Sequence, residues 1–470
     1  MENIYKTFLI KLGLNGPEIL INNQVNINNF LSFENNQYTI ITGMGGVDPI
    51  FLREYEGEFY ISNLEFLLVF QNDKISIFGE SLIANLCGDV NQNYTFFYQI
   101  QKLDCTSKYI LNGCNLMKQS LFHKTTSTKS DIFKSLKASY QNLSNEKIIL
   151  PISGGYDSRL SLGFLKDNVD LLIHQLNNEE DTKIVYELND IVKKELVILN
   201  KKIDKEVTTS VSQRLIASSV RPTFFKWFNY LERYSSNYQI VGFGAEAHKG
   251  KYYDKIINIK QDSHRLFKLS DLKVQALKLQ LGFNNIESVR HETIDQIIND
   301  AQLVYEEKSS IIDYIHYHLY VSHAYGKRNN AFSSILNVKL PTLNFEFLNK
   351  TFSLEKEIKE KAKLNKDFMQ MISSELVNVD FHSGNASSFK PKGNLFFQKI
   401  KALKFLLRGN SRDSNFIISR NIGLPKNELT FKLLNLISSN NKFINRNSTI
   451  IVYNYLRDLE DLKDVEFSII

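Results

Sequence analysis

The chain has 470 residues, too many for one hydrophobic core, so we expect two or three domains. A composition of 43% hydrophobic and 23% charged residues argues against disorder, and a net charge of +6 is too modest to require a nucleic-acid partner. Three cysteines without C-x-x-C spacing argue against a zinc knot or a disulfide framework. No segment approaches the roughly 18 apolar residues of a membrane helix or has the pattern of a signal peptide, so we expect a cytoplasmic protein.

The first 120 residues contain short segments of β-favouring residues separated by Asn, Asp and Gly, which predict an all-β or α/β-layered domain. These segments are 38–42, 50–53, 58–62, 67–70 and 74–78. The next stretch, to residue 146, is rich in Ser, Thr, Lys and Asn and has helical periodicity from Ile132 to Tyr140. It predicts a linker and the first helix of a second domain, so we divide the chain into 1–120 and 121–470.

From Lys147 onward, predicted strands alternate with predicted helices. The strands are 148–152, 171–175 and 195–199, with helices beginning near Ser158 and spanning 181–192. This alternation predicts an α/β domain with a doubly wound parallel sheet. Its ligand crevice should lie at the carboxyl ends of the strands.

A turn of small residues, Ser153-Gly154-Gly155, follows the first of these strands and precedes a helix. Backbone N–H groups and the helix dipole favour an anion at such a helix start, which predicts a phosphate or pyrophosphate site. Arg159 supports this, because a cation in the first helical turn opposes the dipole unless an anion is bound there. Neither G-x-x-x-x-G-K-[ST] nor G-x-G-x-x-G with a following acid occurs. An ordinary Gly-Gly turn is the alternative.

A second apolar strand, beginning at Tyr238, ends in the turn Gly242-Phe243-Gly244-Ala245-Glu246. The pattern brings another carboxylate, Glu246, to the same crevice. Magnesium needs only one or two carboxylates beside phosphate oxygens and water, so Asp157 and Glu246 are the candidate metal pair. A capped loop acid is the alternative for Glu246.

The sequence S-G-G-x-D-S resembles the pyrophosphate loop of the ATP pyrophosphatases, and the preceding Leu-Pro-Ile is most like the asparagine synthetase and β-lactam synthetase branch. The resemblance implies a PP-loop, HUP-like sheet with a helical extension, which uses ATP and Mg²⁺. The residues that it assigns to ATP are Ser153, Gly154, Gly155, Asp157, Ser158, Gly242 and Gly244. It also implies that Asp157 and Glu246 hold the metal.

Phe243 departs from this family, which has Glu or Tyr at that position to help deprotonate the attacking nitrogen. Phenylalanine cannot accept a proton, so either another group is the base or the amine arrives neutral. The candidate bases are His248, His174 and Tyr156, although a lone histidine is more often structural.

Two later segments also resemble the family. Residues 339–348 resemble R-x-P-F-L-D-x-x-F-L, with Lys339 and Asn344 in place of Arg and Asp. Residues 363–369 resemble G-x-x-K-x-x-L-R, which carries a catalytic lysine. Lys366 matches that lysine, and Lys363, one turn earlier, is the fallback. An ammonium there would balance charge on the α-phosphate and later stabilise an oxyanion. A solvated surface lysine is the alternative.

The first domain resembles a class II glutamine amidotransferase domain of the Ntn type (αββα-like). The resemblance rests on residues 48–51, 58–62 and 95–103. That family needs an N-terminal cysteine nucleophile, and position 2 here is Glu2. We therefore expect a degenerate domain without glutaminase activity.

Together these features predict an ATP-dependent, AMP-forming amide ligase. It would adenylate a small-molecule or peptide carboxylate and transfer the acyl group to an amine other than ammonia released from glutamine. A non-catalytic nucleotide-binding or scaffold homologue is the alternative, motivated by Glu2, Phe243 and the altered 339–348 segment. A PP-loop enzyme acting on RNA is less attractive, because the charge is modest.

Overall fold

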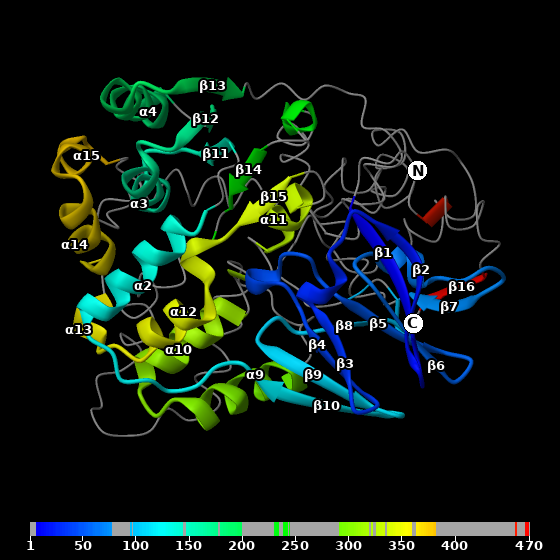
Figure 1. Cartoon of the computed structure of the whole chain (residues 1–470). Coiled ribbons are helices and arrows are strands. Elements are labelled where there is room, and N and C mark those ends of the chain that lie inside the picture. Colours follow the sequence, from blue (N-terminus) through cyan, green and yellow to red (C-terminus); the bar gives the residue numbers. More distant parts are fainter. Residues whose placement is uncertain are drawn as a thin grey trace, which may run out of the picture.

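The computed structural model describes residues 6–77, 95, 97–143, 147–176, 179–199, 230–234, 238–242, 244, 291–318, 321–322, 326–333, 336–359, 363–381, 456–457 and 466–469. Within these ranges the fold is mixed α/β, as the sequence predicts. Strands from the first 120 residues form antiparallel sheets, and a parallel sheet with its helices follows (Figure 1).

Two antiparallel sheets make up most of the first 120 residues. The first has the order β2-β1-β6-β5-β8 and the second the order β10-β9-β4-β3. Their strands are β1 (Thr7–Gly13), β2 (Gly16–Asn23), β3 (Leu31–Glu34), β4 (Gln37–Ile41), β5 (Phe51–Tyr55), β6 (Glu58–Ser62), β8 (Gln101–Lys102), β9 (Ser107–Asn112) and β10 (Asn115–Ser120). Alternate residues such as Ile10, Ile61 and Ile40 pack in one core between the sheets. The strands predicted at 38–42, 50–53 and 58–62 are confirmed as β4, β5 and β6.

The strand predicted at 67–70 is wrong, because Glu65–Leu68 form a 3-10 helix, η3. Arg53 explains this turn. Its side chain is 4% exposed, donates a hydrogen bond from Nη1 to the Leu68 carbonyl at 2.6 Å, and pairs with Asp73. The guanidinium thus occupies a carbonyl that a strand neighbour would otherwise have used.

The end of the chain returns to the first 120 residues. The predicted strand at 74–78 is observed as β7 (Lys74–Ile77), and it pairs in parallel with β16 (Glu466–Ile469). Nothing in the sequence pattern indicates this pairing. The division into 1–120 and 121–470 stays a prediction.

The parallel sheet has the order β13-β12-β11-β14-β15, and all its pairs are parallel. Its strands are β11 (Lys147–Pro151), β12 (Val169–Gln175), β13 (Glu195–Leu199), β14 (Tyr238–Val241) and β15 (Asn337–Lys339). Ile148 and Leu150 belong to one apolar cluster and Ile149 to another, so both faces of β11 are buried. Burial on both faces explains why the central strands are continuous apolar runs.

Helices α3 (Tyr156–Leu165) and α4 (Glu179–Val192) connect the first three strands of this sheet. Thr128 and Asp131 form a capping box at the start of the helix that begins at Lys129, which confirms the predicted first helix of this part of the chain. The remaining α-helices are α2 (Lys129–Gln141), α9 (His291–Val304), α10 (Lys308–His316), α11 (Gly326–Ser333), α12 (Phe345–Phe352), α13 (Lys356–Lys359), α14 (Lys363–Ile372) and α15 (Ser374–Asn378). The other 3-10 helices are η1 (Ile27–Asn29), η2 (Met44–Gly46), η5 (Glu232–Tyr234) and η8 (Pro341–Leu343).

The antiparallel sheets pack against the helices that follow the parallel sheet. The Gly45 amide donates to the Tyr317 hydroxyl at 3.0 Å, and Thr106 Oγ1 lies 3.3 Å from His318 Nδ1. These contacts are buried, so the two antiparallel sheets, which together form a β-sandwich, share an interior with the end of α10. Among the described helices, none combines the length and apolarity that a membrane span requires.

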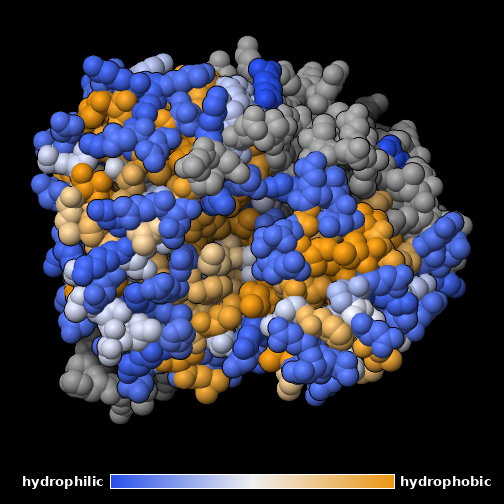
Figure 2. Space-filling view, in the orientation of Figure 1, coloured by the Kyte–Doolittle hydropathy of each residue, from blue (hydrophilic) through white to orange (hydrophobic). Residues whose placement is uncertain are grey.

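The edge strand β2 exposes apolar side chains. Ile19, Leu20 and Ile21 are 53%, 45% and 39% exposed, and Figure 2 shows a hydrophobic area over β1 and β2. Because β2 ends the order of its sheet among the described strands, its outer backbone edge is unpaired there.

Candidate nucleotide site

The two predicted glycine turns leave neighbouring strands of the parallel sheet. β11 pairs with β14, with Lys147 opposite Tyr238 and Ile149 opposite Ile240. From β11 the chain moves outward to β12 and β13, whereas β14 and β15 lie on its other side. The order therefore reverses between β11 and β14. The carboxyl ends of strands at such a switch point are where open α/β sheets bind ligands.

Ser153 and Ser158 hold the first turn in shape. Ser158 Oγ accepts a hydrogen bond from the Ser153 amide at 3.0 Å and donates to the Ser153 carbonyl at 3.0 Å. The two hydroxyl oxygens are 3.1 Å apart, and the Gly155 amide donates to Ser153 Oγ at 3.4 Å. Both serines are half-buried. The turn is therefore preorganised by its own side chains.

The Gly154 amide is held by a residue that the sequence analysis missed. It donates to Asp181 Oδ1 at 2.7 Å, and Asp181 lies in the first turn of α4 with 7% of its surface exposed. A Cβ on Gly154 would lie 2.9 Å from that oxygen and 3.1 Å from Ile184. We therefore infer that Gly154 packs the turn against α4 and does not bind phosphate. The available signal was an acid at the start of the helix predicted at 181–192.

Helix α3 begins at the turn without a side-chain cap. Gly155 is its N-cap residue and forms no side-chain cap hydrogen bond, so the first amides of the helix remain donors for a ligand. Asp157 lies in this first turn and is half-buried. An anion and a cation can therefore both be bound at the start of α3.

Helix α14 brings two polar residues to this turn. Asn365 is fully buried, and its Nδ2 lies 3.5 Å from Asp157 Oδ1, the long limit of a hydrogen bond. Its Oδ1 is buried and has no hydrogen-bond partner among the described residues. The Nζ of Lys366 lies 5.4 Å from the centroid of the Tyr156 ring, beside the turn. Lys366 is exposed, as is Lys363 at the start of the same helix.

Arg159 does not face the turn as the sequence analysis expected. Its side chain is fully buried, stacks on Phe381 with 3.8 Å between the guanidinium carbon and the ring centroid, and donates to backbone carbonyls. The acceptors are the carbonyls of Leu376 (3.0 Å), Val379 (2.5 Å), Asp380 (2.7 Å) and Gly154 (3.3 Å). Burial lowers its pKa to about 10, which leaves it charged near neutral pH. Three of these carbonyls lie at or beyond the end of α15, where the dipole favours a cation, so no bound anion is required.

The candidate bases are placed as follows. His174 is 1% exposed, and its two ring nitrogens lie 3.0 Å from the Ile152 carbonyl and 3.0 Å from Thr182 Oγ1, so it is structural. Tyr156 is 9% exposed and stacks on Phe381 at 3.9 Å. Phe243, Glu246 and His248 lie outside the described residues.

The second turn packs against the segment that resembles R-x-P-F-L-D-x-x-F-L. The Gly242 amide donates to the Lys339 carbonyl at 2.9 Å, and a Cβ on Gly242 would lie 2.5 Å from Leu340. Gly244 has a φ of +138°, and a Cβ there would lie 2.4 Å from Leu343. Both positions therefore require glycine for close packing. Asn344 caps α12 through its side chain, as the aspartate of the family motif also could.

In the described part of the chain, no group of three or more His, Cys, Asp or Glu residues converges on one point. A magnesium site of the predicted kind does not need one, because one or two protein oxygens beside phosphate and water are enough. Asp157 supplies a carboxylate, and Asn365 Oδ1, which has no partner among the described residues, is a second hard oxygen next to it. These residues fit a hard divalent cation.

No protein-family model matches the chain, and no curated protein matches it in sequence. Among solved structures, NMN synthetase from Francisella tularensis matches with 12% identity and a TM-score of 0.20. The match covers 41% of this chain and 94% of that one. A similarity of this size does not bear on function.

Proposed function

We propose that the chain is an ATP-dependent, AMP-forming ligase that makes an amide. One observation carries the proposal: the S-G-G-x-D-S turn and the second glycine turn follow adjacent strands at the switch point of a parallel sheet. The start of α3, whose N-cap is a glycine without a capping side chain, and the lysine of α14 beside it are compatible with this proposal.

The residues of the turn have distinct roles in this proposal. The first amides of α3 bind the β- and γ-phosphates, which leave together as pyrophosphate, while Ser153 and Ser158 hold the turn in shape. Asp157, with Glu246 from the second turn and the Asn365 amide oxygen, would hold Mg²⁺. When bound, the metal would neutralise phosphate charge.

The reaction has two steps. A carboxylate oxygen of the substrate attacks the α-phosphorus, and the bond to the β-phosphate oxygen breaks. An amine nitrogen then attacks the acyl carbon, AMP leaves, and the amine loses a proton. In this proposal Lys366, beside the turn, offsets the charge that develops at the α-phosphate and then at the acyl oxygen. No described residue beside the turn is assigned as the base.

The first experiment measures exchange of labelled pyrophosphate into ATP with Mg²⁺ and a panel of carboxylates, because this exchange needs no amine. We expect Asp157→Asn to lower exchange by about 100-fold or more. Asp167→Asn is the matched control, since Asp167 is exposed at the far end of α3. Equal exchange by wild type and Asp157→Asn would contradict the proposal. Calorimetric ATP binding without exchange for any carboxylate would support the non-catalytic homologue instead.

A second pair of variants tests the lysine assignment. Lys366→Met should lower exchange by roughly 100-fold, because it removes the only side-chain charge that is proposed to offset the charge developing at the α-phosphate. Lys363→Met removes the same charge one turn earlier on the same helix, and we expect little change. The reverse ranking would move the catalytic role to Lys363.

A further inference from the structure

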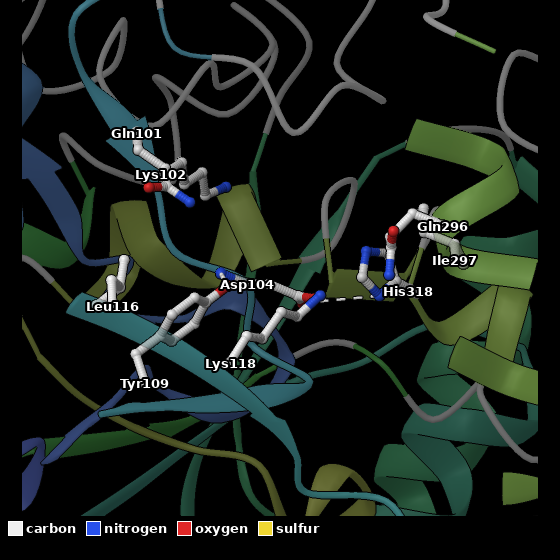
Figure 3. Close-up of a pocket in the computed structure, with 9 residues that line it drawn as sticks. All are labelled: Gln101, Lys102, Asp104, Tyr109, Leu116, Lys118, Gln296, Ile297 and His318. Atoms are coloured by element: carbon white, nitrogen blue, oxygen red, sulfur yellow. Dashed lines mark hydrogen bonds and ion pairs between the residues drawn. The ribbon is translucent and has the colours of Figure 1, made fainter. Parts of the chain in front are cut away.

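A cavity lies away from the nucleotide site, between the two antiparallel sheets, helix α9 and the segment that follows α10. Its volume is about 270 Å³. Figure 3 shows the residues that line it, which include two lysines, an aspartate and a histidine. Nothing in the proposed ligase reaction uses these residues.

Asp104 is fully engaged with its neighbours. Its Oδ1 accepts from the Thr106 amide at 2.9 Å and lies 3.6 Å from His318 Nδ1. Its Oδ2 accepts from Thr106 Oγ1 at 2.8 Å and pairs with Lys118 at 3.0 Å. Burial pushes the pKa of Asp104 up, but His318, Lys118 and Thr106 outweigh it and hold that pKa below its usual value. Asp104 and Lys118 therefore form an ion pair, and Lys118 also pairs with Asp300 at 3.3 Å.

Lys102 is the lining cation that forms no direct ion pair with the described residues, although Glu65 and Asp104 act on it from farther away. It lies apart from the Asp104 group in Figure 3, and its amine forms no ion pair with that part of the chain. Burial lowers the pKa of Lys102, and the nearby Glu65 and Asp104 only partly offset this. Burial also lowers the pKa of His318, and the nearby Asp104 partly offsets this. Because Lys118 is engaged by Asp104 and Asp300, Lys102 is the lining lysine that can pair with an anionic occupant.

The rest of the lining sets the size and character of an occupant. Leu116, the buried Ile297 and the ring of Tyr109 supply apolar wall, and the amides of Gln101 and Gln296 lie at the cavity. The volume is just below the range of about 300–1,000 Å³ that is typical of ligand pockets. It therefore suits a small molecule rather than a nucleotide.

We propose that this cavity binds a small monocarboxylate with a short apolar body, whose carboxylate pairs with Lys102. The pairing supplies a counterion to the half-buried Lys102 ammonium, and the apolar walls pack against the body of the ligand. The site is independent of the nucleotide site, so the failure of one proposal leaves the other unaffected.

The test uses the full chain, with isovalerate as the probe and saturation-transfer NMR as the readout. We expect isovalerate to bind the wild type and its neutral isostere isovaleramide to bind roughly 10-fold more weakly or worse, because the charged contact is lost. Lys102→Met keeps the length of the side chain and should weaken binding to the same extent. Lys108→Met is the control, since Lys108 is the strand neighbour of Tyr109, points to the other face of the sheet and does not line the cavity.

Three results would overturn the proposal. They are the absence of saturation transfer from isovalerate to the wild type, equal binding of isovalerate and isovaleramide, and undiminished binding by Lys102→Met. The comparison of the two isosteres needs no variant, so it remains decisive if Lys102→Met does not fold. Competition by inorganic phosphate as strong as by isovalerate would overturn the assignment to a carboxylate with an apolar body.

Discussion

Replacing Asp181 by alanine should loosen the S-G-G-x-D-S turn without touching any residue that is proposed to meet the nucleotide. The substitution removes the 2.7 Å hydrogen bond from the Gly154 amide to a buried carboxylate, a bond to a charged group worth about 1.5–3 kcal/mol. It also removes a negative charge from the first turn of α4, worth about 0.3–1 kcal/mol. The local stability of the turn should therefore fall by about 2–4 kcal/mol.

Hydrogen exchange measured by mass spectrometry on peptides covering residues 147–160 is the appropriate assay, because a chain of this length need not unfold in one step. A loss of 2–4 kcal/mol corresponds to roughly 30- to 1,000-fold faster exchange. Glu179→Ala is the matched control. Glu179 is exposed in the same first turn, so its loss should cost only the dipole contribution of about 0.3–1 kcal/mol. Equal exchange in the two variants would refute the role assigned to Asp181.

Three further predictions concern other residues. Arg159→Met should lower the apparent melting temperature, because it leaves the buried Leu376 carbonyl without a donor, at about 1–3 kcal/mol, and releases the part-buried carbonyls of Val379 and Asp380. Arg159→Lys should not restore it, since an ammonium cannot reproduce the planar fork, and full rescue would contradict this account. Asn365→Leu should leave thermal stability unchanged or slightly higher, because it removes a buried oxygen that has no partner among the described residues, while pyrophosphate exchange falls by roughly 10-fold; a loss of stability with normal exchange would show that the amide is only structural. Iodoacetamide should label the exposed Cys114 in the native protein but not Cys105, which is buried and whose pKa burial raises to about 12. Peptide mapping of the labelled protein checks this, and faster labelling of Cys105 than of Cys114 would contradict it.

Local sequence patterns predicted the structure correctly where the residues of a single strand, turn or helix determine it. The apolar run before Ser153 is the central strand β11, and the strand predicted at 195–199 is β13. The alternation after Lys147 predicted a parallel doubly wound sheet, and the pairing of β11 with β12 and β14 confirms it. In contrast, the segment 67–70 has strand-like residues, but Arg53 turns its backbone into a 3-10 helix. The buried contact with Arg53, which is distant in sequence, overrides the strand propensity of this segment.

The sequence alone determined the order of elements around the S-G-G-x-D-S turn and the chemistry of its residues, because strand and helix patterns repeat over a few neighbours. Only the tertiary structure decided which groups face the crevice. It turned the Gly154 amide to Asp181, buried Arg159 among carbonyls near α15, and set Asn365 and Lys366 at the start of α3. Each of these contacts joins residues from different elements, and most join residues far apart in the chain. Such partners are selected by packing in three dimensions, and no local spacing in the sequence records them.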